Sequence, residues 1–200
     1  MLKFLLNRQL DGFARRYGYD VGYMRAVAEV DPMAMARFGL INAMSSYRRG
    51  IPPEPYFAAK LRTIVIDDCG PCTQLVVNMA LEAGVPGSVI QAIVRQDFAA
   101  LAPDTAMVAR FAEYTLAHAL EADPLRDEIR ARWGERGLIS IAFAISSTRV
   151  YPALKYALGH GHACTKVHVG SNNFAPMSGS PLHEAPPQLA ARRGAIAARD

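Results

Sequence analysis

Apolar residues recur at three- and four-residue steps along most of this chain, which is the spacing of one face of an α-helix. The pattern is clear near the start, where Leu2, Leu6 and Phe13 share one face and Gly18 follows. Glycine just past a helical pattern commonly ends the helix. The sequence therefore predicts a first helix over residues 2–17.

The next 30 or so residues carry the signals that start and stop helices. Asp20 is placed to cap a short helix that runs to residue 30. Asp31 and Pro32 then provide a capping residue followed by proline at the first helical position, where proline is tolerated. We expect this third helix to continue to about residue 47, with a break at residues 50–53.

Residues 54–66 are ambiguous, because they begin with a helical pattern and end in the β-branched run Thr63-Ile64-Val65-Ile66. A strand here, leading into a Cys-x-x-Cys helix, would match the thioredoxin arrangement. That fold needs further strands alternating with helices downstream. The chain after Cys72 instead keeps a helical period, which favours a helical protein.

Downstream, the pattern predicts helices near residues 73–83, 89–94, 103–118, 125–133 and 138–158. We expect Pro152 to kink or divide the last of them. No segment predicts a β-hairpin. The expected fold class is all-α, with eight or nine helices.

The composition changes after Gly159, where Gly, Ser, Asn, Pro and His become frequent. We expect one helical domain over residues 1–169 and an irregular or disordered arm over residues 170–200.

Composition and charge exclude some function classes. Hydrophobic residues make up 51% of the chain and charged residues 20%, and the formal net charge is only +4. No basic stripe interleaved with aromatic residues is present, so we expect no nucleic-acid partner. The apolar runs at residues 1–8 and 138–145 are too short for a signal peptide core and a membrane span. We expect a cytoplasmic protein without a membrane partner.

The strongest chemical signal is Cys69-Gly70-Pro71-Cys72, which holds two of the three cysteines. Two thiols at this spacing form a disulfide within one turn, and a helix N-terminus stabilises a thiolate. So short a loop contributes little as a structural staple. The pair therefore indicates thiol redox chemistry, with Cys69 the expected nucleophile if it lies at the helix N-cap.

Two acidic residues, Asp67 and Asp68, directly precede the pair. Either could transfer protons, and we include Asp68 with Cys69 and Cys72 as a candidate catalytic residue. Capping of the cysteine helix is the favoured alternative for both acids.

Other polar residues lie near the pair in sequence. Glu54 and Lys60 could reach the site from the preceding segment, and Gln74 and Asn78 are polar neighbours on the cysteine helix.

The central segment, about residues 56–96, resembles the carboxymuconolactone decarboxylase and alkylhydroperoxidase D (AhpD-like) family. The resemblance rests on the Cys69–Cys72 motif, an apolar helix, the run Met79-Ala80-Leu81-Glu82-Ala83-Gly84-Val85-Pro86, and another amphipathic segment at residues 88–96. It implies an all-helical AhpD-like bundle that forms a homo-oligomer.

The resemblance also implies that the two cysteines reduce hydroperoxides or exchange electrons with a disulfide or dithiol protein partner, without a bound cofactor. Peroxidase members carry a glutamate about a dozen residues before the first cysteine and a histidine four residues after the second. This chain has Phe57 and Val76 at those positions. The usual proton relay is therefore missing, and at most weak hydroperoxide reduction is expected.

The working hypothesis is a thiol-disulfide oxidoreductase or weak hydroperoxide reductase. Two alternatives remain open: a non-catalytic helical interaction protein of the same fold, and a decarboxylase-like small-molecule enzyme that does not use the dithiol. A third is zinc binding by the loop from His160 to His168, although its spacing matches no tight zinc pattern, and no metal site is expected. His118, on an apolar helix face, is expected to be a core histidine.

Overall fold

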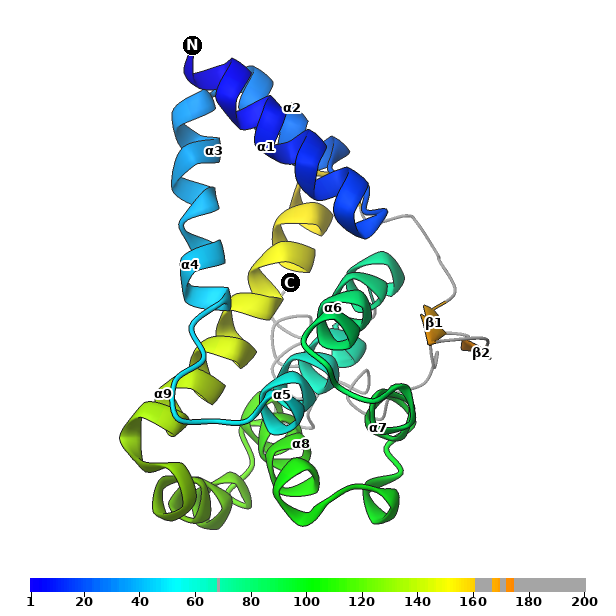
Figure 1. The fold of residues 1–200 in the computed structure, drawn as a ribbon. Helices are drawn as coiled ribbons and strands as arrows, with labels where there is room; N and C mark the ends of the chain where they lie inside the picture. The colour runs from blue at the N-terminus through cyan, green and yellow to red at the C-terminus, as the bar shows by residue number, and fades with distance from the viewer. Residues whose placement is uncertain (68, 161–166, 170–171, 175–200) are drawn as a thin grey trace, which may run out of the picture.

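The computed structural model describes residues 1–67, 69–160, 167–169 and 172–174. Most of these residues are helical, which confirms the all-α fold class. The helices are α1 (Leu2–Tyr17), α2 (Gly22–Val30), α3 (Pro32–Gly39), α4 (Ile41–Ser45), α5 (Pro53–Ile66), α6 (Gly70–Glu82), α7 (Gly87–Val94), the short 3₁₀ helix η1 (Phe98–Ala100), α8 (Pro103–Ala117) and α9 (Ala122–Ala157). Figure 1 shows their arrangement.

The helix starts and stops near the N-terminus follow the local chemistry. Gly18 ends α1 in the left-handed conformation, with φ of 61°. Asp20 accepts a hydrogen bond from the N–H of Gly22, and Asp31 accepts one from Met33 at the start of α3. The predictions for Gly18 and Asp31 are confirmed, whereas the N-cap of α2 is Val21, one residue after the predicted Asp20. The expected single helix to residue 47 is wrong, because the chain divides it into α3 and α4 at Leu40, directly after Gly39.

Helix α5 is the centre of the molecule, and it contacts α6, α7, α8 and α9 (Figure 1). It resolves the ambiguity of residues 54–66 in favour of a helix. Ten of its 14 residues are buried, so its β-branched end is stabilised by packing on all sides despite a weaker helix propensity. The Thr63 hydroxyl donates to the Ala59 carbonyl 2.8 Å away, which satisfies this polar group inside the core.

A buried arginine joins α5 to two of its neighbours. The Arg62 guanidinium donates to Glu113 on α8 at 2.7 Å and to the carbonyls of Ile93 and Val94 at the end of α7. These bonds engage two carbonyls at the C-terminus of α7 and fix the packing of three helices.

The long final helix is interrupted at Gly134 and not at Pro152. Gly134 has φ of 68° and ψ of −176°, and it separates a charged first part from an apolar second part. Pro152 lies within regular helix, so the predicted division there is wrong. By length and mean hydropathy, α9 is the one described helix that could cross a membrane, but 44% of its most apolar window is buried, and core helices have the same properties.

Two short strands, β1 (Val167–Val169) and β2 (Asn172–Phe174), pair antiparallel. The expectation of no hairpin is wrong for this small ladder, which lies after the helical part. The rest of the region expected to be an irregular arm lies outside the described residues.

Two hydrophobic clusters form the core. The larger surrounds α5 and includes Cys69 and Cys72. The smaller joins α1, α2 and α3 and reaches Leu75 on α6 and Tyr151 on α9. Where the two clusters meet, the packing leaves a cavity, which is described next.

Candidate functional site

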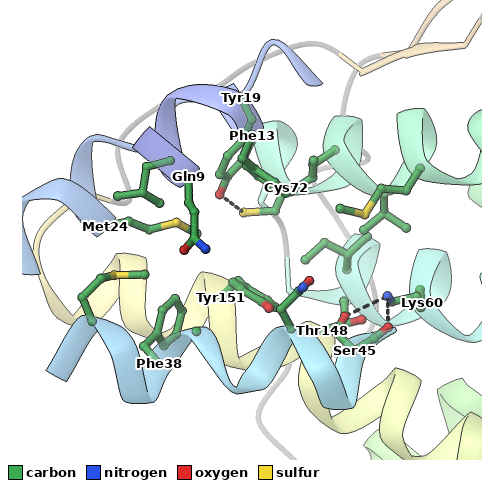
Figure 2. Close-up of a pocket in the computed structure, with 18 residues that line it drawn as sticks. Gln9, Phe13, Tyr19, Met24, Phe38, Ser45, Lys60, Cys72, Thr148 and Tyr151 are labelled. Atoms are coloured by element: carbon green, nitrogen blue, oxygen red, sulfur yellow. Dashed lines mark hydrogen bonds between the residues drawn. The ribbon is translucent and has the colours of Figure 1, made fainter. Parts of the chain in front are cut away.

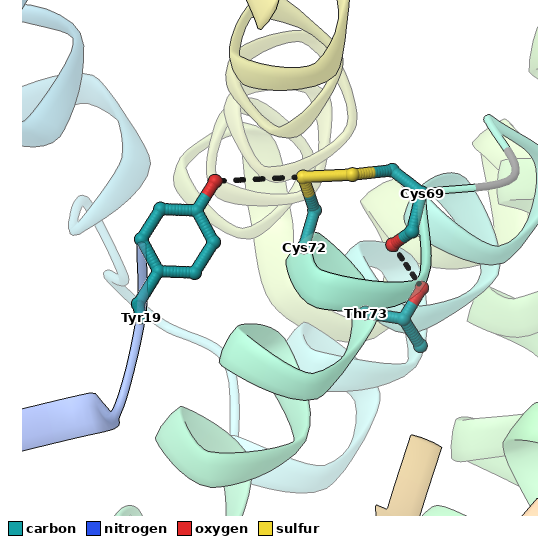
Figure 3. Close-up of a disulfide and its surroundings, with 4 residues drawn as sticks. All are labelled: Tyr19, Cys69, Cys72 and Thr73. Atoms are coloured by element: carbon teal, nitrogen blue, oxygen red, sulfur yellow. Dashed lines mark hydrogen bonds between the residues drawn. A yellow bond between two sulfur atoms is a disulfide. The ribbon is translucent and has the colours of Figure 1, made fainter. Parts of the chain in front are cut away.

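Cys69 and Cys72 are joined by a disulfide at the N-terminus of α6 (Figure 3). Cys69 is the N-cap residue, and Gly70-Pro71 forms the first helical positions, where proline needs no partner for its missing N–H. The Cα atoms are 5.2 Å apart. The Thr73 hydroxyl donates to the Cys69 carbonyl at 3.0 Å and stabilises the first turn. The sequence prediction that the two sulfurs lie within bonding reach is confirmed.

Tyr19 provides a hydrogen bond to the pair. It lies just after α1, and its phenol is 3.6 Å from Cys72 Sγ (Figure 3). A disulfide sulfur has no proton, so the phenol is the donor. Burial raises the pKa of Tyr19, which keeps the phenol neutral and able to donate. Lys155, which is also buried, lies 6.0 Å from the Tyr19 ring centroid.

Cys72 faces a cavity of about 400 Å³ between the two hydrophobic clusters (Figure 2). Most of the lining is apolar or aromatic and comes from helices on both sides. These lining residues are Leu10, Phe13, Tyr19, Met24, Met35, Phe38, Ile64, Leu75, Val76, Met79 and Tyr151. The volume falls in the range of small-molecule sites.

The cavity opens between α1 and the α3–α4 junction. Three lining residues, Gln9, Gly39 and Asn42, are solvent-exposed, whereas those on α5 and α9 that line the far side are buried or half-buried. Cys72, 3% exposed, is therefore reached from solvent through the cavity. Cys69 is equally buried but is not part of the lining.

Of the described residues that line the cavity, Lys60 is the one with a charged side chain. Its Nζ donates to the carbonyl oxygen and the hydroxyl of Ser45, both at 2.8 Å. The ammonium also lies 5.3 Å from the ring centroid of Tyr56. Burial lowers the pKa of Lys60 to about 8. Among the described residues no carboxylate pairs with it, which is unusual for a buried cation.

Thr148, also in the lining, has no hydrogen-bond partner among the described residues. The hydroxyl of Thr148, on α9, is buried and makes no hydrogen bond. Most buried hydroxyls are paired, so this exception indicates a place where a bound molecule would supply the missing partner.

The structure does not place Asp67 as a cap of the cysteine helix, and it does not describe Asp68. Asp67 ends α5 and accepts a hydrogen bond from Arg149 Nε at 3.2 Å, so it does not cap the cysteine helix. Burial raises the pKa of Asp67, and Arg149 partly offsets that rise. Asp68 lies outside the described residues, and its proposed catalytic role stays a prediction.

The remaining polar candidates do not join the cavity lining. Gln74 donates to Asn78, and Asn78 donates to the Tyr17 carbonyl, so these two residues fix α6 against α1. His118 is exposed and ends α8 in the left-handed conformation, so the core-histidine prediction is wrong. Most of the loop considered for zinc lies outside the described residues.

The sequence pattern missed most of the cavity. The sequence predicts Lys60 only as a residue within possible reach and Tyr151 only as a core or interface aromatic residue, and it gives no role to Tyr19, Ser45 or Thr148. One available signal is the position of Lys60 directly after the apolar run Tyr56-Phe57-Ala58-Ala59. Ser45 and Thr148 are brought together only by the packing of α4 against α9.

Comparison with known proteins gives no match to this chain. No protein-family model matches the chain, and neither a curated protein nor a solved structure matches it. The candidate site therefore rests on its own geometry.

Proposed function

We propose that this protein is a thiol-disulfide oxidoreductase, with weak hydroperoxide reductase activity, of the AhpD-like type. The observation that carries the proposal is the placement of a Cys-x-x-Cys pair at a helix N-terminus with Cys72 facing an open apolar cavity. A purely structural disulfide needs neither the cavity nor the buried phenol beside the sulfur.

Cys72 is the nucleophile in this proposal, and Cys69 is the resolving thiol. Cys72 lines the cavity, whereas Cys69 does not. In the reduced protein, the Tyr19 phenol and the N–H groups of the first turn of α6 stabilise a thiolate at Cys72. This assignment reverses the role expected for Cys69 from the sequence, because the cavity determines which sulfur a substrate meets first.

With a hydroperoxide as the substrate, the Cys72 thiolate attacks the terminal peroxide oxygen. A sulfur–oxygen bond forms, the oxygen–oxygen bond breaks, and the alkoxide takes up a proton and leaves as an alcohol. The Cys69 thiol then attacks the Cys72 sulfenic acid, which forms the disulfide and releases water. An external dithiol reduces the disulfide by exchange and completes the cycle.

With a disulfide as the substrate, the same thiolate forms a mixed disulfide and releases one thiol. Cys69 then displaces the second thiol and forms the internal disulfide. Both reactions need the same two sulfurs and the same access, so one set of variants tests both.

The test is steady-state turnover of an apolar hydroperoxide and of a small aromatic disulfide, with dithiothreitol as the reductant. Cys72→Ser should abolish turnover of both, and Cys69→Ser should slow it, because dithiothreitol must then take the place of the resolving thiol; replacement of the exposed His118 by Gln should not change turnover. If both cysteine variants match the wild type, the dithiol is not used. Either the decarboxylase-like enzyme or the non-catalytic interaction protein would then be the better description.

A further inference from the structure

The cavity holds a buried positive charge that the described part of the chain does not neutralise. Lys60 is 5% exposed and hydrogen-bonds only to Ser45, a neutral residue. Among the residues that the structure describes, no aspartate or glutamate lines the cavity. A buried charge without a counter-charge is destabilising, so the site is electrostatically complementary to an anion.

Three groups at the cavity wall are able to donate hydrogen bonds to such an anion. The Lys60 ammonium has three N–H bonds and uses two on Ser45, and its third N–H meets only the ring faces of Tyr56 and Phe57 among the described residues. The Ser45 hydroxyl accepts from Lys60, and its own O–H is available to donate. The Thr148 hydroxyl is buried and has no partner. In Figure 2 the three side chains lie toward the same end of the cavity, away from Met24.

The rest of the wall fits an unbranched alkyl chain. Met24, Met35 and Phe38 come from the N-terminal helices, and Leu75 and Met79 come from α6. Methionine side chains adapt their shape to a flexible apolar ligand. A single cation with two hydroxyls also suits a carboxylate better than a phosphate, which usually binds several cationic or N–H groups.

We propose that the cavity binds a medium-chain aliphatic carboxylate. The carboxylate would accept hydrogen bonds from Lys60, Ser45 and Thr148, and the alkyl chain would lie against the methionines and Phe38. Binding itself does not depend on the redox state of the cysteines. The further identification of the substrate as a hydroperoxide of such an acid rests on the proposed function, because Cys72 lines the same cavity.

Isothermal titration of the full-length, oxidised protein with decanoate and decan-1-ol tests the proposal. The wild type should bind decanoate at least about tenfold more tightly than the alcohol, because only the acid pairs with the ammonium. Lys60→Met should remove that preference and leave binding of the alcohol nearly unchanged. Lys3→Met, at an exposed ion pair with Glu29, is the matched control and should behave like the wild type.

Thr148→Val provides a second test, should Lys60→Met fail to fold. It keeps the side-chain shape and should weaken decanoate binding severalfold, with little effect on the alcohol. Equal affinity of the wild type for acid and alcohol, no binding of decanoate, or unchanged decanoate affinity in the variants would overturn the proposal.

The Cys69→Ser/Cys72→Ser double variant separates this proposal from the proposed function. It should lose turnover and keep decanoate binding. Normal binding with inert cysteines in the wild type would leave the ligand proposal standing and remove the redox one. Turnover without any decanoate binding would remove the ligand proposal and leave the redox proposal standing.

Discussion

Two buried side chains of the cavity lack a partner among the described residues: Thr148 has no hydrogen-bond partner, and Lys60, which hydrogen-bonds to Ser45, has no counter-charge. Such groups cost stability in the ligand-free protein and are favourable only when a ligand pairs with them. The effect of each residue on the free energy of unfolding can therefore be measured without knowing the substrate.

Replacing Thr148 by Val should raise the free energy of unfolding of the ligand-free protein by about 1 kcal/mol, because an unpaired buried hydroxyl is removed. Thr63→Val is the control. It removes a buried hydroxyl that donates to Ala59, so it should lower the free energy of unfolding by up to about 1 kcal/mol. Urea denaturation of the oxidised protein measures both. A greater loss of stability for Thr148→Val than for Thr63→Val would contradict this interpretation.

Lys60 should make stability depend on pH in a defined window. Its pKa is about 8 in the folded protein and 10.5 in the unfolded chain, so above pH 8 the unfolded state binds more protons. Stability should therefore rise with pH. Between pH 7 and about 9.5 the gain is on the order of 2 kcal/mol.

In the Lys60→Met variant, the free energy of unfolding should not show this rise with pH. Other titrating groups contribute equally to the variant and to the wild type. The difference between the two unfolding free energies, measured at each pH, isolates the lysine. A difference that does not change with pH would show that the Lys60 pKa is not lowered by burial.

Tyr19→Phe should raise the pKa of the Cys72 thiol in the reduced protein, because the thiolate loses a hydrogen-bond donor. Alkylation of Cys72 by iodoacetamide near neutral pH should slow by about three- to tenfold. Tyr47→Phe, whose ring packs on Phe143, is the control and should leave the rate unchanged. Equal alkylation rates in the wild type and both variants would show that Tyr19 does not stabilise the Cys72 thiolate.

At the scale of the elements, Gly134 determines where the long C-terminal helix changes direction. Its φ of 68° with ψ of −176° is a conformation that essentially only glycine adopts. A Cβ there would meet no atom within 4 Å, so any cost of a substitution comes from the backbone alone.

Gly134→Ala should lower the free energy of unfolding by about 1–3 kcal/mol. Gly12→Ala, within α1 and likewise without contacts within 4 Å, should raise it by about 0.5–1 kcal/mol, because alanine favours a regular helix. Thermal unfolding of both variants makes the comparison. A loss of stability at Gly12 as large as at Gly134 would contradict the backbone explanation.

The sequence predicted the helices that have local start and stop signals and failed where packing decides. Asp31 with Pro32 correctly marks the start of α3, and the apolar helix predicted after the Cys-x-x-Cys motif is α6, whose N-cap is Cys69. The division at Leu40, directly after Gly39, and the regular helix at Pro152 were missed, because a glycine or proline in a helical pattern permits either outcome.

The candidate site was predictable only in its local part. The cysteine motif is local, so spacing alone identified it. Lys60 and Thr148 are 88 residues apart, and they line one cavity only because α4, α5 and α9 pack together. A single sequence carries no local signal for such a juxtaposition.

At the scale of the whole molecule, the cavity lies where the N-terminal helices meet the central bundle. The N-terminal helix α1 packs through part of one face, while Leu2, Phe4 and Leu5 remain exposed. Large apolar side chains gathered on one surface favour association with another copy.

A homo-oligomer therefore stays our expectation. Light scattering on the purified protein should give a mass at least twice the 21.8 kDa of one chain. Phe4→Ser, at a residue that is 69% exposed, should shift the mass toward the single-chain value. A single-chain mass for the wild type at micromolar concentrations and above would rule out the expected assembly.

The most direct test of the central claim, that Cys69 and Cys72 cycle through the cavity, is intact-mass analysis of the reduced protein after one equivalent of an apolar hydroperoxide. The wild type should lose two hydrogen atoms through a Cys69–Cys72 disulfide, and Cys69→Ser should accumulate a dimedone-reactive sulfenic acid at Cys72. Both thiols remaining reduced, with no sulfenic acid in the variant, would contradict the claim.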